Sequence, residues 1–166
     1  MPLCYHARVK PVPKTNAMRI LESMGIRYDT ATYPVGKEHV DAVTVARELG
    51  VKPETVWKTL VAHDEKGSPL VFCIPGPSEL DLKKAAKAAG AKKVELINLK
   101  DLTPLTGYVR GGCSPIGMKK KLPTWIDEIA ATFPRIYVNA GARGVQVLIA
   151  PSDLGRAADA RFADLV

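Results

Sequence analysis

Lys58 is the residue whose type and position first suggest chemistry. It lies in an alternating run in which Val56, Leu60 and Ala62 share its face and Trp57 and Val61 share the other. A strand that is apolar on both faces is typically covered on both. A buried ammonium group is costly and must find a partner, often an anion of a ligand. The alternative is that Lys58 lies near the strand start and reaches water through its flexible stem.

A glycine-rich segment, GGCSPIG at residues 111–117, is the second candidate. Its glycines allow close backbone approach and outward-pointing amides, which could hold a phosphate or a developing oxyanion. The spacing is neither GxxxxGK[ST] nor GxGxxG, so neither nucleotide-binding fingerprint applies. A plain turn remains the structural alternative. The lysines at 119–121 could steer an RNA backbone or form a solvated face.

A third segment, residues 139–144, predicts a tight connection between two strands. Its Arg143 could clamp phosphate or carboxylate, or could simply be exposed in a hairpin loop. The three histidines show no metal-ligand spacing with the cysteines, and no GxSxG elbow occurs. Cys113 could be a nucleophile, but a small buried cysteine is the more frequent case.

The surrounding pattern predicts short helices and strands that interleave irregularly. We expect helices over residues 15–24, 41–49, 81–89 and 98–105, and a last helix opening at Ser152 or Asp153. We expect strands over residues 26–33, 56–62, 70–74, 94–97, 136–139 and 145–149, with a hairpin joining the second and third. This pattern predicts a single α+β domain, residues 15–166, with a curved mixed sheet or partial barrel flanked by helices. Residues 1–14, which hold three prolines, read as an extended tail.

Composition restricts the class of protein further. The 166 residues suit one domain, and the net charge of +7 favours polyanionic partners, nucleic acid above all. The alternative is that the excess of basic residues has no specific function, as in many small soluble proteins. The three cysteines cannot all pair and none has CxxC spacing, so a reducing cytoplasm fits best. No signal peptide or membrane span is expected.

These features occur together in one family. The sequence resembles the bacterial YbaK-type Cys-tRNA(Pro) deacylases, relatives of the editing domain of bacterial prolyl-tRNA synthetases. The resemblance spans most of residues 15–165. It is carried by VWKTL at 56–60, LDLKK at 80–84, GAKKVE at 90–95, TGY at 106–108, GGCSPIG with its following lysines, LPT at 122–124 and NAGARG at 139–144.

The resemblance implies an α+β fold with a crevice for the 3′ end of tRNA, and a hydrolase that cleaves the ester of a mischarged tRNA. It implies neither metal nor cofactor. Lys58 matches the lysine on which activity depends, and residues 111–117 match the loop that lines the site. The implied substrate-binding set is Tyr33, Thr59, Gly111, Gly112, Cys113, Ser114, Pro115, Gly117, Arg143 and Gln146.

Cys-specific members are thought to use the thiol of the substrate to attack its own ester. Such an intramolecular attack can gain roughly 7–11 kcal/mol from proximity. Lys58 would then bind the substrate or its terminal nucleotide and offset negative charge, and Cys113 would be structural. Gln146 departs from the family because some relatives carry an acidic residue there, and a carboxamide cannot act as a base.

Several alternatives stay open. Residues 36–45 match the family poorly, so the preferred substrate could be Ala-tRNA(Pro). A Cys-specific enzyme could also act on Cys-tRNA(Cys). The chain could also be a tRNA- or synthetase-binding module without turnover, or a domain that binds a phosphate ligand or nucleotide. Whether a prolyl-tRNA synthetase must be bound is an open question.

Overall fold

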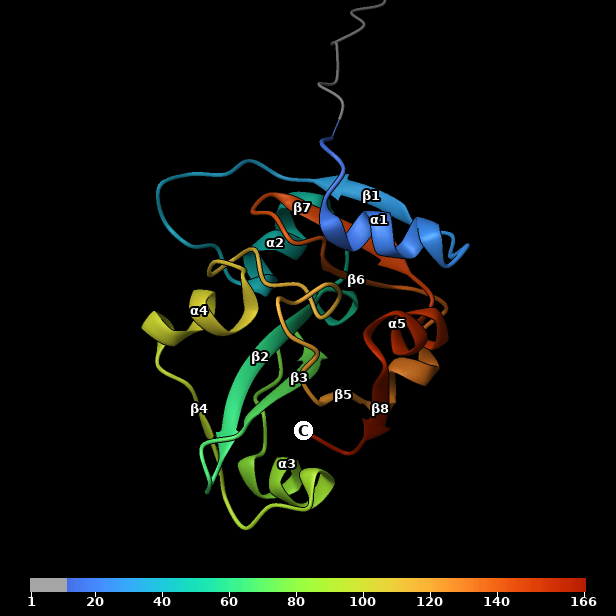
Figure 1. Cartoon of the computed structure of the whole chain (residues 1–166). Coiled ribbons are helices and arrows are strands. Elements are labelled where there is room, and N and C mark those ends of the chain that lie inside the picture. Colours follow the sequence, from blue (N-terminus) through green and yellow to red (C-terminus); the bar gives the residue numbers. More distant parts are fainter. Residues whose placement is uncertain (1–11) are drawn as a thin grey trace, which may run out of the picture.

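Two β-sheets of unequal size organise the chain (Figure 1). The computed structural model describes residues 12–166. A three-stranded sheet has the order β1-β7-β6 and a five-stranded sheet the order β4-β2-β3-β5-β8. A parallel bridge between Val56 and Tyr137 joins them. The fold is therefore α+β with an open, mixed sheet system, as the sequence predicts.

The five-stranded sheet is built on a long hairpin. Strand β2 (Trp57–Asp64) pairs antiparallel with β3 (Pro69–Pro75), so that Lys58 lies opposite Ile74 and Thr59 opposite Cys73. This confirms the predicted hairpin. Strand β4 (Val94–Leu96) adds antiparallel to the far end of β2. Strands β5 (Thr124–Asp127) and β8 (Ala160–Ala163), which the sequence pattern does not predict, add in parallel beyond β3.

The three-stranded sheet is entirely antiparallel. Strands β6 (Ile136–Asn139) and β7 (Val145–Ile149) form the predicted hairpin, with Gly141 at φ 94° in its turn. Only glycine takes this left-handed conformation without strain. Strand β1 (Asp29–Thr32) pairs with the other edge of β7 and is shorter than the predicted 26–33.

Local capping signals account for three of the helices. Thr15 accepts a hydrogen bond from the Met18 amide and starts α1 (Asn16–Ser23). Asp41 caps α2 (Ala42–Leu49) and Asp81 caps α3 (Leu82–Ala89), and each of these ends at a glycine in the left-handed conformation. These three starts confirm the predictions.

The remaining helices are short. The predicted helix over 98–105 is a 3₁₀ turn, η2 (Leu99–Asp101), followed by α4 (Leu102–Thr106). Helix α5 (Pro151–Ala158) starts one residue before the first of the two predicted positions, Ser152 and Asp153, because proline is favoured at the first helical position. The other 3₁₀ turns are η1 (Pro53–Thr55) and η3 (Glu128–Thr132).

The hydrophobic core lies between the sheets and these helices. Its largest cluster joins α1, the three-stranded sheet, α5 and Trp57, and a second lies between the β2–β3 hairpin and α3. The predicted tail over 1–14 lies outside the described residues for its first eleven positions, whereas Val12 packs against the largest cluster. Across residues 12–166, no helix has the length and apolar character needed to cross a bilayer.

Candidate active site

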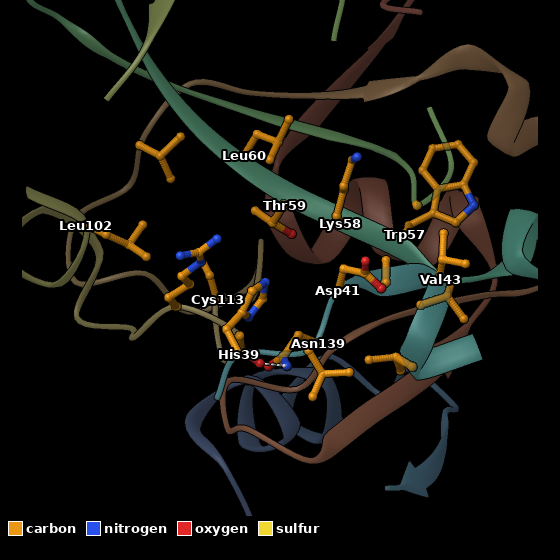
Figure 2. Close-up of a pocket in the computed structure, with 18 of the residues that line it drawn as sticks. His39, Asp41, Val43, Trp57, Lys58, Thr59, Leu60, Leu102, Cys113 and Asn139 are labelled. Atoms are coloured by element: carbon orange, nitrogen blue, oxygen red, sulfur yellow. Dashed lines mark hydrogen bonds between the residues drawn. The ribbon is translucent and has the colours of Figure 1, made fainter. Parts of the chain in front are cut away.

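A cavity of about 590 Å³ opens beside β2, between the start of α2 and the first residues of the glycine-rich segment (Figure 2). The structure brings part of the predicted site together around it. The predicted residues that line it are Tyr33, Lys58, Thr59, Gly111, Cys113 and Gln146. Its other polar or charged lining residues are His39, Asp41, Arg110 and Asn139.

The second half of the glycine-rich segment does not line this cavity. The buried Ser114 hydroxyl accepts a hydrogen bond from the Ile116 amide at 3.2 Å, which closes a local turn. Pro115 and Gly117 border a separate cavity beside α5. Gly112 is buried, and its amide donates to Val109 at 2.9 Å. Two of the amides expected to be oxyanion donors are therefore already bonded, and these residues shape the loop.

Lys58 is half-buried on β2, and none of the ion pairs formed within residues 12–166 includes it. Burial lowers the pKa of its ammonium group, and the more distant carboxylates of Glu79 and Asp41 oppose that shift. Lys58 and Thr59 leave β2 on opposite sides, so the cavity wraps the open edge of the strand (Figure 2). The ammonium is thus partly desolvated without a contacting counter-ion, which suits it to an anionic ligand.

Two buried polar atoms in the cavity wall lack hydrogen-bond partners: Thr59 Oγ1 and Gln146 Oε1. Gln146 is only 4% exposed and lies opposite Asn139 on β6. The Thr59 hydroxyl faces the Cys73 thiol across the hairpin and opposes the rise of its pKa, but outside good hydrogen-bonding geometry. An unsatisfied buried group costs about 1–3 kcal/mol, so such groups are rare in native proteins. Both atoms are therefore suited to accept hydrogen bonds from a bound ligand.

Asn139 fixes the loop that carries Gly111. Its Nδ2 donates to the Gly111 carbonyl at 2.8 Å (Figure 2), and its Oδ1 accepts from the amides of Gly141 and Ala142 at 2.7 and 3.1 Å. Gly111 has φ 81°, and a Cβ there would lie 3.0 Å from Nδ1 of His39. Asn139 thus holds two loops together. The sequence marks Asn139 as the first residue of the 139–144 connection, but it does not reveal the bond to the Gly111 carbonyl.

Arg143 does not line the cavity but holds one of its walls in place. Its guanidinium donates to the carbonyls of Gly36 and Glu38, at 3.2 and 2.9 Å, and so anchors the segment that precedes α2. That segment and the first turn of α2 together form one wall of the cavity. Its lining residues are His39, Val40, Asp41, Ala42, Val43 and Val45. Partial burial, then the charge of Arg110, lowers the pKa of His39, while Asp41 opposes the shift.

Cys113 lies in the wall as a buried thiol that is 8% exposed. Burial raises its pKa to about 12, so the thiol stays protonated at neutral pH and is a poor nucleophile. Within residues 12–166, no three His, Cys, Asp or Glu side chains are grouped to hold a metal ion. The arrangement can bind an anion and orient a polar group. It presents no ionised cysteine that could attack a substrate.

Comparisons with known proteins agree with this fold. A family model described as the aminoacyl-tRNA editing domain matches residues 37–157. A protein of Enterococcus faecalis, assigned as a Cys-tRNA(Pro)/Cys-tRNA(Cys) deacylase, is 46% identical over 159 residues, which cover 96% of this chain and 97% of that one.

Two solved structures share the fold. A structure assigned to a trans-editing enzyme for prolyl-tRNA synthetase has a TM-score of 0.77 at 26% identity and covers 91% of this chain and 97% of its own. A scaffold from computational epitope grafting has a TM-score of 0.77 at 27% identity, covering 90% and 95%. The chain belongs to the aminoacyl-tRNA editing domain family.

Proposed function

We propose that the chain is a trans-editing deacylase that hydrolyses Cys-tRNA(Pro), and also Cys-tRNA(Cys). The observation that carries the proposal is one cavity that combines Lys58, without a contacting counter-ion, with the unpartnered oxygens of Thr59 and Gln146. In this proposal these groups bind and orient the ester, and none of them is the nucleophile. The name of the Enterococcus faecalis relative supports the same substrates.

The chemistry that fits this cavity uses a nucleophile from the substrate. The cysteinyl sulfur attacks the ester carbonyl and forms a cyclic thioester, the bond from carbon to the 3′ oxygen breaks, and that oxygen takes up the thiol proton. Water then opens the thioester to free cysteine. Holding the sulfur beside the carbonyl can be worth roughly 7–11 kcal/mol. Lys58 offsets negative charge on the ester or the terminal nucleotide, while Thr59 and Gln146 accept hydrogen bonds.

The partners follow from the same reaction. The net charge of +7 suits binding of tRNA, and Arg110 places a cation at the cavity that can meet its terminal phosphates. A complex with prolyl-tRNA synthetase, which would supply the mischarged tRNA, is supported by the similarity to a structure assigned to a trans-editing enzyme for that synthetase. The cytoplasm is where both partners occur.

A deacylation panel tests the proposal. Wild-type protein and Lys58→Ala are incubated with Cys-, Ala- and Pro-tRNA(Pro), and the remaining aminoacyl-tRNA is measured over time. We expect only Cys-tRNA(Pro) to be consumed, and only by the wild type. Equal loss of Ala-tRNA(Pro) would show that the substrate thiol is not needed. Binding of all three tRNAs without hydrolysis would show a tRNA-binding module.

A further inference from the structure

Asp41 is the one carboxylate among the described residues that line the cavity. Figure 2 shows it on the side of β2 that faces Asn139, the same side as the Thr59 hydroxyl. By its resemblance to the family, the chain has Gln146 where some relatives carry an acidic residue. The structure places a carboxylate in the same cavity from a different element, the residue that caps α2.

The position and charge of this carboxylate are fixed by the helix that it caps. Its Oδ1 accepts a hydrogen bond from the Thr44 amide at 2.7 Å. That bond, above all, lowers the pKa of Asp41, so the group is ionised at neutral pH. None of the ion pairs within residues 12–166 includes Asp41. Lys58, His39 and Arg47 act on it only at longer range. Asp41 is thus an oriented anion without a contacting cation.

A second observation points to a ligand in the same cavity. The Gln146 carboxamide is 4% exposed, and its Oε1 lacks a partner. Because Gln146 Oε1 and a carboxylate are both acceptors, a single ligand group that satisfied both would carry several hydrogen-bond donors. A primary ammonium has three donors and a positive charge, and no acceptor. It fits this wall better than a carboxylate or a phosphate would.

We infer that Asp41 binds the α-ammonium group of the aminoacyl ester, with Gln146 as the second acceptor. The inference rests on the proposed function, because it names the part of the substrate that this wall recognises. It gives the site a specificity: esters with a free amine are accepted, whereas N-acylated esters, which carry no cation, are disfavoured. A cytoplasmic deacylase with this preference would spare peptidyl-tRNA and formylated initiator tRNA.

Binding of unreactive analogues tests this inference apart from turnover. The probes are 3′-cysteinylamino-3′-deoxyadenosine and its N-acetyl derivative, in which an amide replaces the ester, and Kd is measured by calorimetry. The test variant is Asp41→Asn, which removes the charge but keeps the acceptor for Thr44, since asparagine caps helices as well as aspartate does. The matched control is Asp81→Asn, the same change at the cap of α3, outside the cavity.

We expect wild type and Asp81→Asn to bind the free-amine analogue roughly tenfold more tightly than the N-acetyl analogue, as for a partly exposed charge-assisted hydrogen bond. In Asp41→Asn the ratio should fall to near one. A ratio near one in the wild type, a preference that survives in Asp41→Asn, or no binding of either analogue would overturn the inference. If the preference is found but Cys-tRNA(Pro) is not hydrolysed, the proposed function fails while the inference stands.

Discussion

The contact between Gly76 and the start of α2 allows a sharp prediction. Gly76 follows β3 and lines the cavity, and its amide donates to the Val56 carbonyl at 2.7 Å. A Cβ at Gly76 would lie 2.6 Å from the Ala42 Cβ and 2.6 Å from the Val56 oxygen. Gly76 does not have a positive φ, so the effect of Gly76→Ala is steric. Ala42 is the first residue of α2, and its displacement would move Asp41 with it.

We expect Gly76→Ala to lower the free energy of unfolding by about 1–3 kcal/mol, the usual range for overpacking a filled interior. Urea denaturation followed by circular dichroism measures this. The variant should also raise KM in the deacylation assay, because the wall that carries Asp41 shifts. The matched control is Gly36→Ala, where the added Cβ meets nothing within 4 Å and φ is not positive. If Gly76→Ala is as stable as this control, our account of how α2 packs on the hairpin is wrong.

Three other substitutions test the roles assigned above. Lys58→Met should abolish deacylation yet leave the midpoint in urea unchanged or higher at pH 7. Burial lowers the pKa of Lys58 in the folded state, so between the folded and unfolded pKa values the unfolded chain binds more protons. The free energy of unfolding of the wild type should therefore rise with pH across that range. A Lys58→Met variant less stable than the wild type would contradict the cost assigned to burying the ammonium. Asn139→Ala should lower the free energy of unfolding by about 1–3 kcal/mol and raise KM, because the Gly111 carbonyl and two turn amides lose their partner; unchanged urea stability would refute its anchoring role. Cys113→Ala should keep single-turnover deacylation within about threefold of wild type, since the thiol is protonated; complete loss with the fold intact would make it catalytic.

Sequence predicted the elements that are defined by local chemistry. The helices capped by Thr15, Asp41 and Asp81 begin where predicted, because a capping side chain and a following apolar stripe lie within a few residues. Strands β5 and β8 were missed. Each has four residues and pairs in parallel with a strand far away in sequence, so no local pattern marks it.

The sequence predicts only those parts of the site that a local pattern marks. Lys58 stood out as a charge in an apolar run, and that signal is local. The sequence predicts Asp41 only as the first residue of a helix. The segment that leads to it is held by bonds from Arg143 to the carbonyls of Gly36 and Glu38, which sequence does not reveal. The sequence predicts the whole glycine-rich segment as part of the site, but only tertiary packing decides that Gly111 and Cys113 line the cavity.

The central claim is that the Lys58 cavity positions an ester for attack by the thiol of its own substrate. Single-turnover deacylation of Cys-tRNA(Pro) and Ser-tRNA(Pro) tests this most directly, because serine carries an oxygen where cysteine carries sulfur. The account predicts that wild-type protein consumes Cys-tRNA(Pro), that Lys58→Ala does not, and that Ser-tRNA(Pro) stays at the background rate. Equal rates for the two substrates, or full activity of Lys58→Ala, would contradict it.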